Sequence, residues 1–328
     1  MRHRLFLVAT LTGITLVGYG CGGSDTDSSS SPSAQRFISL GSAPPGGAFF
    51  VVGGALAEVL NQHAPGWEVT SEATKGSQEN IRRLDSGELD LALLNSSITY
   101  FAVRGEGSWQ KPYPLRTVMT LAPNVALFIT PESSGVRTIA DLRDKRVVVG
   151  PAGAGWEAFV SPIVEAHGLT YDDFTPLNNT QSGSVDMLAD GSAVAAILGG
   201  AVPTASIVQA ATSQDILMVP FDPEARRNLI AEYPFFYEQT IPAGTYRGQR
   251  DDYQGLDVGS MHLVTTAGAG DDLVYEITKA IYESRENVAR IHPAGLAINP
   301  GNVVRNTGVE FHPGAIRYFR EIGIWPQP

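Results

Sequence analysis

Residues 41–95 read GSAPPGGAFFVVGGALAEVLNQHAPGWEVTSEATKGSQENIRRLDSGELDLALLN, and the pattern of this stretch decides the fold. It predicts a strand end, a Gly/Pro loop, a helix, a strand, a loop of small residues, a second helix and a third strand. Strands that alternate with helices indicate an α/β fold with a mostly parallel sheet. Each loop opens a helix, and the unpaired N–H groups of a helix N-terminus favour an anion. We therefore expect both loops to face one crevice that binds a small, anionic molecule.

The same pattern returns later in the chain. The segment LDSG at residues 84–87 recurs as LADG at residues 188–191, in each case before an apolar strand. Upstream of the second copy, RVVVG at residues 146–150 leads into PAGAGWEAFV, which indicates a strand, a Gly-rich loop and a helix. This duplication predicts two lobes, in which the opening stretch forms one jaw of a cleft and the other jaw comes from residues 150–157 and 178–200.

Two extended segments connect the predicted lobes. Residues 125–131 leave the first lobe as a strand, and residues 257–267 return to it. Two such crossings are what a hinged clamshell requires. Helices are expected near the end of the chain at residues 271–291 and 312–323. The predicted division is the first part of lobe one at residues 36–130, lobe two at residues 131–257, and the return to lobe one at residues 258–328.

The composition indicates an acidic protein with enough apolar residues for two cores. The chain has 328 residues, of which 43% are hydrophobic and 17% are charged, and this length favours two lobes over one. The formal net charge is −11 and the pI is near 5.0. A nucleic-acid partner requires a basic face, so the charge argues against one.

Residues 1–20 have the layout of a signal peptide, because a basic start precedes an apolar run too short to span a bilayer. The single cysteine, Cys21, follows directly, and residues 21–35 form a serine-rich segment of flexible-tether type. The layout resembles a bacterial lipoprotein signal, although Gly18 stands where that signal usually has Leu. We expect export to the periplasm or the cell-envelope surface, with Cys21 lipidated as a membrane anchor. An ordinary secretory signal that leaves a free thiol is the alternative.

Several long blocks resemble one family. They include EATKGSQENIRRLDSGELDLALLN at residues 72–95, IADLRDKRVVVGPAGAGWE at residues 139–157 and YPFFYEQTIPAGTYRGQ at residues 233–249. These blocks are similar to the TAXI family, the extracytoplasmic solute-binding subunits of TRAP transporters. The resemblance implies a two-lobed periplasmic-binding-protein fold (Venus flytrap, type II-like) that closes over a ligand. It also implies delivery to TRAP membrane subunits driven by an ion gradient, and ligands such as glutamate and related dicarboxylates.

The departures from the family pattern bear on the ligand. Phe49 and Phe50 replace a Tyr-Tyr pair, and Lys75 replaces a glycine of the second loop. Ser97 stands where the family has Asp, and the lobe-two loop carries Ala154 and Trp156 in place of Ser and Thr. An added cation and a lost carboxylate favour an anion, whereas the lost hydroxyls and the new indole favour an apolar or aromatic part. We therefore expect a carboxylate-like or amino-acid-like ligand other than plain glutamate.

The predicted ligand-binding residues come from the loops at the helix starts and from the strand ends. For the glycines the alternative is a turn requirement, for Ser77 a helix cap, and for Lys75 a solvated charge. Strand ends are where open α/β sheets present ligands. The full set is Gly46, Gly47, Ala48, Phe49, Thr74, Lys75, Gly76, Ser77, Gln78, Asn95, Ser96, Gly153, Ala154, Gly155, Trp156, Gly199 and Gly200.

No catalytic template stands out in the sequence. G-x-S-x-G and H-E-x-x-H are absent, and the six histidines are scattered, so no metal site or cofactor is predicted. Residues 153–158 fit the dinucleotide fingerprint, but the acidic pair Asp172 and Asp173 precedes the next strand rather than ending it. We expect a binding protein and not an enzyme. The alternatives are an exported α/β enzyme that acts on a small anion, and the binding subunit of an ATP-driven importer or a sensor.

Overall fold

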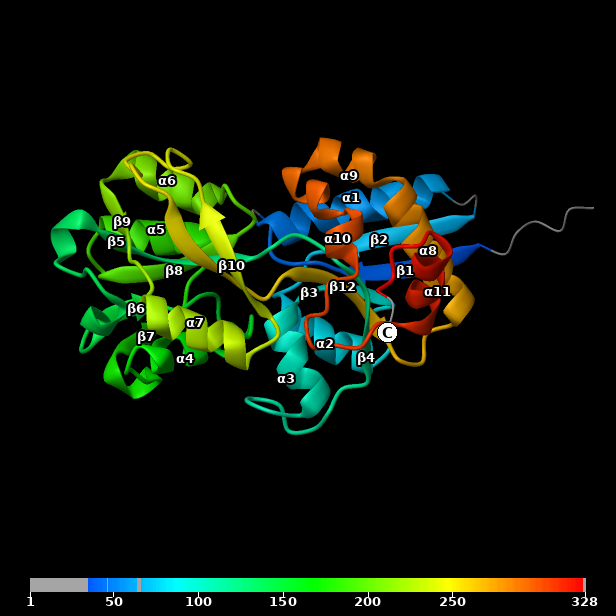
Figure 1. Ribbon diagram of the computed structural model, residues 1–328, viewed down its shortest axis with the longest axis horizontal. Helices are drawn as coiled ribbons and strands as arrows, with labels where there is room; N and C mark the ends of the chain where they lie inside the picture. Colours follow the sequence, from blue (N-terminus) through cyan, green and yellow to red (C-terminus); the bar gives the residue numbers. More distant parts are fainter. Residues whose placement is uncertain (1–34, 46, 64–65, 327–328) are drawn as a thin grey trace, which may run out of the picture. The chain divides into compact units, whose positions relative to one another are not determined.

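The computed structural model describes residues 35–45, 47–63 and 66–326, which contain two β-sheets, each the centre of one lobe (Figure 1). The predicted signal peptide, the tether and Cys21 lie outside these residues. In the first lobe the strand order is β2-β1-β3-β12-β4. β1 is parallel to β2 and β3, whereas β12 is antiparallel to β3 and β4. The bounds are β1 (Arg36–Gly41), β2 (Trp67–Glu72), β3 (Leu91–Asn95), β4 (Leu115–Thr120) and β12 (Met261–Thr266).

β3 is the central strand of the sheet, and its first four residues, LALL, are apolar and buried on both faces. Leu91 and Leu93 pack in one core, and Ala92 and Leu94 pack in another on the opposite face of the sheet. Alternate residues of a strand point to opposite faces, and a nearly continuous apolar run is typical of a strand between two helix layers. The strand therefore carries the first lobe's sheet between two hydrophobic layers.

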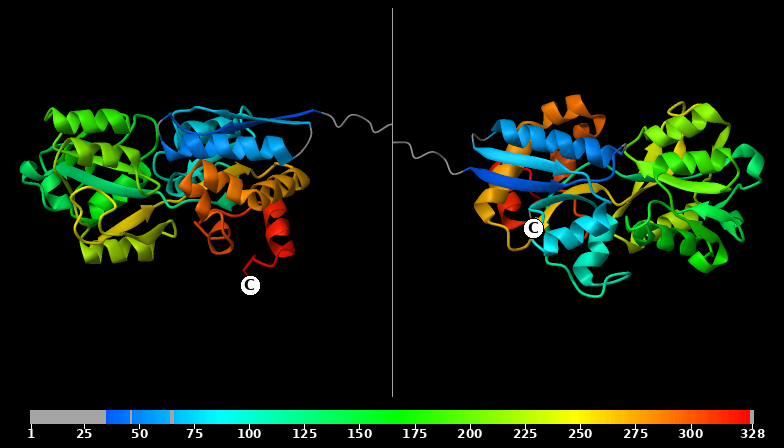
Figure 2. Two further views of the ribbon diagram at one scale, coloured as in Figure 1. Left: turned by 90° about the horizontal axis from the view of Figure 1, so that it is seen from above. Right: turned by 180° about the vertical axis from the view of Figure 1, so that it is seen from behind.

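Helices cover both faces of the first sheet, as the two views of Figure 2 show. The core around Leu91 includes residues of α1 (Ala48–His63), α8 (Asp271–Glu283), α9 (Arg285–Ile291), α10 (Pro300–Val303) and α11 (Pro313–Glu321). The core around Ala92 includes residues of α2 (Ser77–Asp85) and α3 (Ser96–Arg104). The short 3-10 helix η4 (Pro293–Ala297) follows α9.

The second lobe is built on a seven-stranded sheet with the order β10-β11-β5-β8-β6-β7, and β9 pairs with β5. β6 is parallel to β7 and β8, whereas β5 is antiparallel to β8. The strands are β5 (Val125–Pro131), β6 (Arg146–Val148), β7 (Thr175–Leu177), β8 (Ala195–Gly200), β9 (Ile216–Met218), β10 (Phe236–Ile241) and β11 (Tyr253–Val258). The helices are α4 (Glu157–Ala166), α5 (Gln181–Ala189), α6 (Ala205–Ser213) and α7 (Pro223–Glu232), with 3-10 turns at η1 (Glu132–Ser134), η2 (Ile139–Leu142) and η3 (Tyr171–Asp173).

The predicted duplication appears in the strand orders of the two sheets. In the first sheet β2, β1 and β3 are parallel and β12 runs antiparallel beside β3. In the second sheet β7, β6 and β8 are parallel and β5 runs antiparallel beside β8. Each antiparallel strand reaches its sheet directly from the other lobe. The predicted two-lobed α/β architecture with hinge crossings is confirmed.

Two short crossings connect the lobes and are bonded to each other. Leu121 N donates to Met261 O at 2.8 Å, and Met261 N donates to Ala122 O at 2.8 Å. On the side of the second lobe, Val258 N donates to Asn124 O at 2.9 Å. The two crossings therefore form one hydrogen-bonded ribbon, which restricts the hinge to a few residues on each chain segment.

The chain passes from the first lobe's sheet to the second lobe's sheet earlier than the sequence predicts. Residues 125–131 form β5, which pairs with strands of the second sheet, so the change falls at residues 121–124 rather than at residue 130. The strand expected at residues 257–267 is the end of β11 followed by β12. Gly259, with φ of +113°, separates the two strands, and this backbone geometry suits glycine.

The helix expected at residues 271–291 is two helices, α8 and α9, with Ser284 between them. The break allows Val288 of α9 to be buried in the first lobe's core beside α1. Among the residues that the structure describes, no helix is long and apolar enough to cross a membrane.

Candidate functional site

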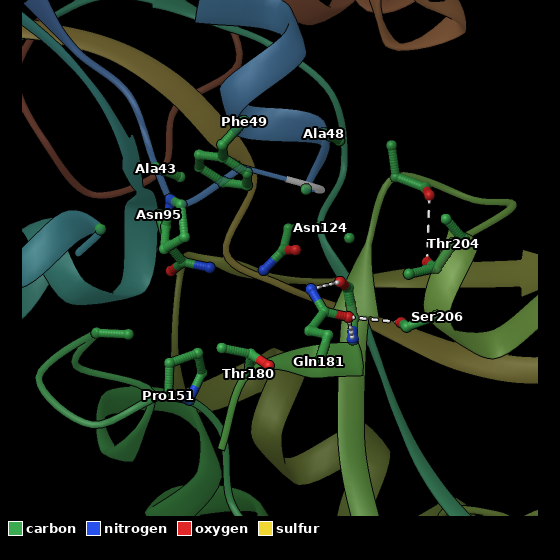
Figure 3. Close-up of a pocket in the computed structure, with 18 of the residues that line it drawn as sticks. Ala43, Ala48, Phe49, Asn95, Asn124, Pro151, Thr180, Gln181, Thr204 and Ser206 are labelled. Atoms are coloured by element: carbon green, nitrogen blue, oxygen red, sulfur yellow. Dashed lines mark hydrogen bonds between the residues drawn. The ribbon is translucent and has the colours of Figure 1, made fainter. Parts of the chain in front are cut away.

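A cavity of about 500 Å³ is lined by residues of both lobes. It lies at the carboxyl ends of parallel strands, because Ser42 follows β1, Asn95 ends β3 and Gly200 ends β8. The carboxyl edge of an open α/β sheet is where ligands bind most often. Volumes of this order are typical of small-molecule sites. The cavity is thus the candidate binding site (Figure 3).

Part of the first-lobe wall is the start of α1 and the proline-containing loop before it. Pro44, Pro45, Ala48, Phe49 and Val51 line the cavity there, and Figure 3 shows the Phe49 ring at this wall. Gly47 also lines the cavity, whereas the predicted residue Gly46 lies outside the described residues. This part of the wall is mostly apolar.

The start of α2 contributes the polar part of the first-lobe wall. Lys75, Gly76 and Ser77 line the cavity. Ser77 Oγ accepts a hydrogen bond from Asn95 N at 2.9 Å, which ties the start of α2 to the end of β3. Thr74 does not line the cavity; it is buried, and its hydroxyl donates to Ser42 O at 3.0 Å. Thr74 therefore stabilises the loop before α2 through a hydrogen bond to the residue directly after β1 rather than through contact with the cavity.

Asn95 lines the cavity, and its side chain makes three hydrogen bonds within the protein. Its Nδ2 donates to Gly259 O at 2.8 Å, and its Oδ1 accepts from Ser97 N at 2.9 Å and from the Ser97 hydroxyl at 2.5 Å. Asn95 thereby caps α3 and bonds to the crossing segment. Ser96 is completely buried, its N–H donates to Ser260 O, and it does not line the cavity.

The loop before α4 supplies one wall of the second lobe. Ala154 and Trp156 line the cavity, together with Pro151. Gly153 and Gly155 do not. A side chain at Gly155 would contact Ile98 at 3.3 Å and Gln78 at 3.4 Å, so this loop packs closely against the first lobe. The predicted residue Gln78 is part of that contact and not of the cavity lining.

Replacing Gly150 by alanine is expected to displace the indole of Trp156. Gly150 has φ of +108°, and a Cβ there would lie 2.5 Å from Trp156 Cε3. The strained backbone at residue 150 is expected to lower the free energy of unfolding by about 1–3 kcal/mol. Displacement of the indole is expected to change the fluorescence emission of Trp156. The matched control is Gly153→Ala, because Gly153 has φ of +75° but a Cβ there meets no atom within 4 Å. Equal emission changes in the two variants would contradict this packing.

Most of the remaining lining residues were not among the predicted ones. Gln181 Nε2 donates to Gly199 O at 2.9 Å, and Gln181 Oε1 accepts from Ser206 Oγ at 2.8 Å, as Figure 3 shows. This network fixes the floor of the cavity around the predicted residues Gly199 and Gly200. Other members of this group include Thr180, Ser182, Ala201, Pro203, Thr204, Ala205 and Gln209 of the second lobe, Ser42, Ala43, Ile98 and His292 of the first lobe, and Asn124 of the crossing.

A sequence signal for part of this group exists in the duplication. Thr180 and Gln181 precede the LADG copy as Gly76 and Ser77 precede the LDSG copy, and both pairs stand at a helix start. Thr204 and Ser206 carry no such local signal, since they follow β8 as part of an unremarkable apolar segment.

The charge balance of the cavity is positive. Lys75 is the one side chain with a full charge among the described lining residues, and none of them is Asp or Glu. Burial lowers the pKa of His292, so its ring is neutral at pH 7, and its Nδ1 accepts from Ala294 N at 3.1 Å. Within the described part of the chain, no group of three or more His, Cys, Asp or Glu side chains is arranged to hold a metal ion.

Comparison with known proteins agrees with this architecture. The model of the NMT1-like family matches residues 40–323. The alkanesulfonate-binding protein SsuA from Xanthomonas axonopodis pv. citri, bound to MOPS, is 16% identical; the match covers 90% of this chain and 88% of that chain, with a TM-score of 0.52.

Two further solved structures show the same architecture at low identity. One comes from work on glutathione import via GshT and the cystine ABC importer TcyBC of Streptococcus mutans. It is 11% identical, with coverage of 80% of this chain and 95% of that chain and a TM-score of 0.51. A Xanthomonas citri protein bound to ATP is 10% identical, with coverage of 87% and 95% and a TM-score of 0.51. These likenesses establish the two-lobed fold of periplasmic binding proteins.

Proposed function

Because the chain belongs to the NMT1-like family and has this two-lobed fold, we propose that it is an extracytoplasmic solute-binding protein. It captures a small organic anion, carboxylate- or amino-acid-like and with an apolar or aromatic part, between its lobes. The observation that carries the proposal is the cavity of about 500 Å³, which both lobes line and in which Lys75 stands beside apolar walls. Contacts from both lobes would favour the closed form when ligand is present.

The membrane partner in this proposal is a TRAP transporter. The resemblance of the sequence to the TAXI family supports it, because that family delivers its ligands to TRAP membrane subunits. A second candidate partner is an ATP-driven importer, and the specific observation in its favour is the structural likeness to a protein from work on a cystine ABC importer. In either case Cys21 would carry a lipid that holds the protein at the cell envelope.

We favour binding without chemical conversion over an exported enzyme. The cavity's one histidine among the described lining residues, His292, uses its Nδ1 to accept a backbone N–H, and no carboxylate of the described lining is placed to act with it. General acid–base catalysis needs a proton-transferring group within hydrogen-bond reach of the substrate. The described lining offers hydroxyl, amide and ammonium groups, which suit recognition.

The proposal predicts that the purified protein binds its ligand and returns it unchanged. Mass spectrometry of the compound released on heat denaturation identifies the ligand, and adding it back is expected to raise the melting temperature, since ligand that binds only the folded state stabilises it. Chemical conversion of that compound by the purified protein would contradict the proposal. Equal melting temperatures with and without it would do so as well.

The transport partner is distinguished by reconstitution. Vesicles that contain TRAP membrane subunits from the same organism are expected to take up the ligand on an ion gradient without ATP, and only when this protein is present. Uptake that requires ATP and an importer's membrane subunits would favour the second candidate instead.

A further inference from the structure

The positive character of the cavity extends beyond Lys75. The first residues of four helices line it: Ala48 of α1, Ser77 of α2, Gln181 of α5 and Ala205 of α6. Each of these helices has nine residues or more, and the N-terminus of each adds positive potential. The one helix among those described that ends at the cavity is α9, which has seven residues and is followed by His292.

No described carboxylate balances this positive potential inside the cavity. The acidic residues closest in sequence to lining residues are Glu79, near Ser77, and Glu157, next to Trp156. Neither of them lines the cavity. Glu79 Oε2 accepts the backbone N–H of Lys75 at 3.2 Å, and Glu157 is exposed at the start of α4. Lys75 forms no ion pair with a described carboxylate within 4.0 Å. An ammonium group on a ligand would therefore have no counter-charge in the cavity, and burying an unpaired charge is strongly unfavourable.

One buried group has an unused hydrogen-bond donor at the cavity. Ser77 is 7% exposed and lines the cavity, and its hydroxyl oxygen accepts from Asn95 N. Among the described residues its hydroxyl proton has no acceptor. Buried donors without a partner are uncommon in native proteins. With Lys75 two residues earlier in the loop that leads into the same helix, Ser77 marks the place for an acceptor that carries negative charge.

The other walls suit an apolar body. Phe49, Val51 and Ile98 of the first lobe and Trp156 of the second lobe line the cavity with Pro44. Trp156 is held by Phe159, with ring centroids 5.4 Å apart, so the indole presents a fixed surface. Removing apolar ligand area from water against such walls is favourable.

We propose that the ligand is an amphiphilic monoanion without an ammonium group: a carboxylate or sulfonate head at Lys75 and Ser77, joined to an aliphatic or aromatic body against Phe49 and Trp156. This inference rests on the proposed function and narrows its ligand class. It excludes zwitterionic amino acids, because the described lining has no carboxylate to pair with their ammonium group. Dianions are expected to bind more weakly than monoanions, since Lys75 is the single full positive charge in the described lining.

The test uses matched probes that share a phenyl body. Isothermal titration of the purified chain compares 3-phenylpropanoate with L-phenylalanine, which adds an ammonium group, with phenylsuccinate, which adds a second carboxylate, and with neutral 3-phenylpropanamide. The expected affinity of 3-phenylpropanoate is at least about tenfold above that of phenylalanine and of the amide, with phenylsuccinate between. A parallel titration with 3-phenylpropane-1-sulfonate distinguishes a carboxylate-specific head site from one that also accepts sulfonate.

The role of Lys75 is tested by Lys75→Met, with Lys145→Met as the control because Lys145 is an exposed lysine that does not line the cavity. Lys75→Met is expected to weaken 3-phenylpropanoate binding about tenfold, to reduce its salt dependence, and to leave the amide's affinity unchanged. Lys145→Met is expected to change none of these.

Phenylalanine that binds as tightly as 3-phenylpropanoate would overturn the inference. So would unchanged affinity in Lys75→Met, or the failure of every monoanion to bind at millimolar concentration. A co-purified ligand with an ammonium group would overturn the inference and leave the proposed solute-binding function standing. Conversion of a bound probe to a product would instead contradict the proposed function.

Discussion

Replacing Arg305 by methionine is expected to lower the free energy of unfolding by about 3–5 kcal/mol, because the change leaves a buried carboxylate without its cation. Asp257, at the end of β11, has a side chain only 1% exposed, and Arg305 Nη2 lies 3.1 Å from its Oδ2. Methionine keeps an apolar contact with the Tyr237 ring, over which the guanidinium carbon lies at 4.2 Å. Urea denaturation followed by circular dichroism measures the loss.

The carboxylate of Asp257 also joins the two crossings. Its Oδ1 accepts from Asn124 N at 3.0 Å, and its Oδ2 accepts from the Ser260 hydroxyl at 2.6 Å. The matched control is the double variant Asp257→Asn/Arg305→Met, which removes both charges. It is expected to recover a large part of the lost stability, since the cost lies mainly in the unpaired charge. A double variant no more stable than Arg305→Met alone would show that the loss comes from packing.

The pH dependence of the Arg305→Met loss has a defined sign. Burial raises the pKa of Asp257 above its usual range even with Arg305 present. A carboxyl group with a raised folded pKa binds a proton more readily in the folded state, so folding becomes more favourable as the pH falls through that pKa. Arg305 lowers the pKa of Asp257 against this effect of burial, so its removal raises the pKa of Asp257 further. The difference between wild type and Arg305→Met is therefore expected to shrink as the pH is lowered.

The sequence predicts the first lobe's elements well because their signals are local. The segment LALLN is apolar up to its final asparagine, follows a helix that ends at a Ser-Gly turn, and forms the buried strand β3. The duplicated segment predicts β8 in the same way. The crossings are different: residues 125–131 are as apolar as any strand, and nothing local tells which of two sheets they join. Pairing of β5 with β8 settles that at long range.

The candidate site shows the same distinction between local sequence signals and long-range contacts. Predicted residues that line the cavity stand at helix starts or strand ends, where local patterns indicate exposed backbone N–H groups. Thr74 and Ser96 occupy the same kinds of position, yet both are buried and neither lines the cavity: the Thr74 hydroxyl donates to Ser42 O, and the Ser96 backbone N–H donates to Ser260 O. Residue type does not report the direction of a side chain at a loop. Gln181 and Ser206 meet only because α5 and α6 start beside the end of β8.

Only some of the residues predicted from the sequence to bind ligand line the cavity. They are Gly47, Ala48, Phe49, Lys75, Gly76, Ser77, Asn95, Ala154, Trp156, Gly199 and Gly200. Their contact with a ligand remains a prediction that the binding experiments address. The resemblance drew attention to Lys75 and Trp156 as departures from a family pattern, and both line the cavity. The structure adds what no motif contains, namely that none of the described residues lining the cavity is Asp or Glu.

Acid is expected to destabilise the protein through His262, a fully buried histidine on β12. Burial lowers its pKa from 6.5 to about 3. Nε2 lies 2.8 Å from the Thr99 hydroxyl and Nδ1 3.5 Å from that of Thr117, so the ring is neutral among neutral partners. Below pH 6.5 the unfolded chain binds a proton at this residue and the folded chain does not. Stability is therefore full above pH 6.5 and falls as the pH drops towards 3.

The size of this effect follows from the shift in the pKa of His262. A difference of about 3.5 pH units at about 1.36 kcal/mol each corresponds to about 4–5 kcal/mol at the acid limit. His262→Gln removes the titrating group, while the other histidines and Asp257 are the same in both proteins. The free energy of unfolding of wild type is expected to fall more steeply than that of His262→Gln, by up to about 1.36 kcal/mol per pH unit below pH 6. Parallel curves for the two proteins would show that His262 does not supply the acid sensitivity.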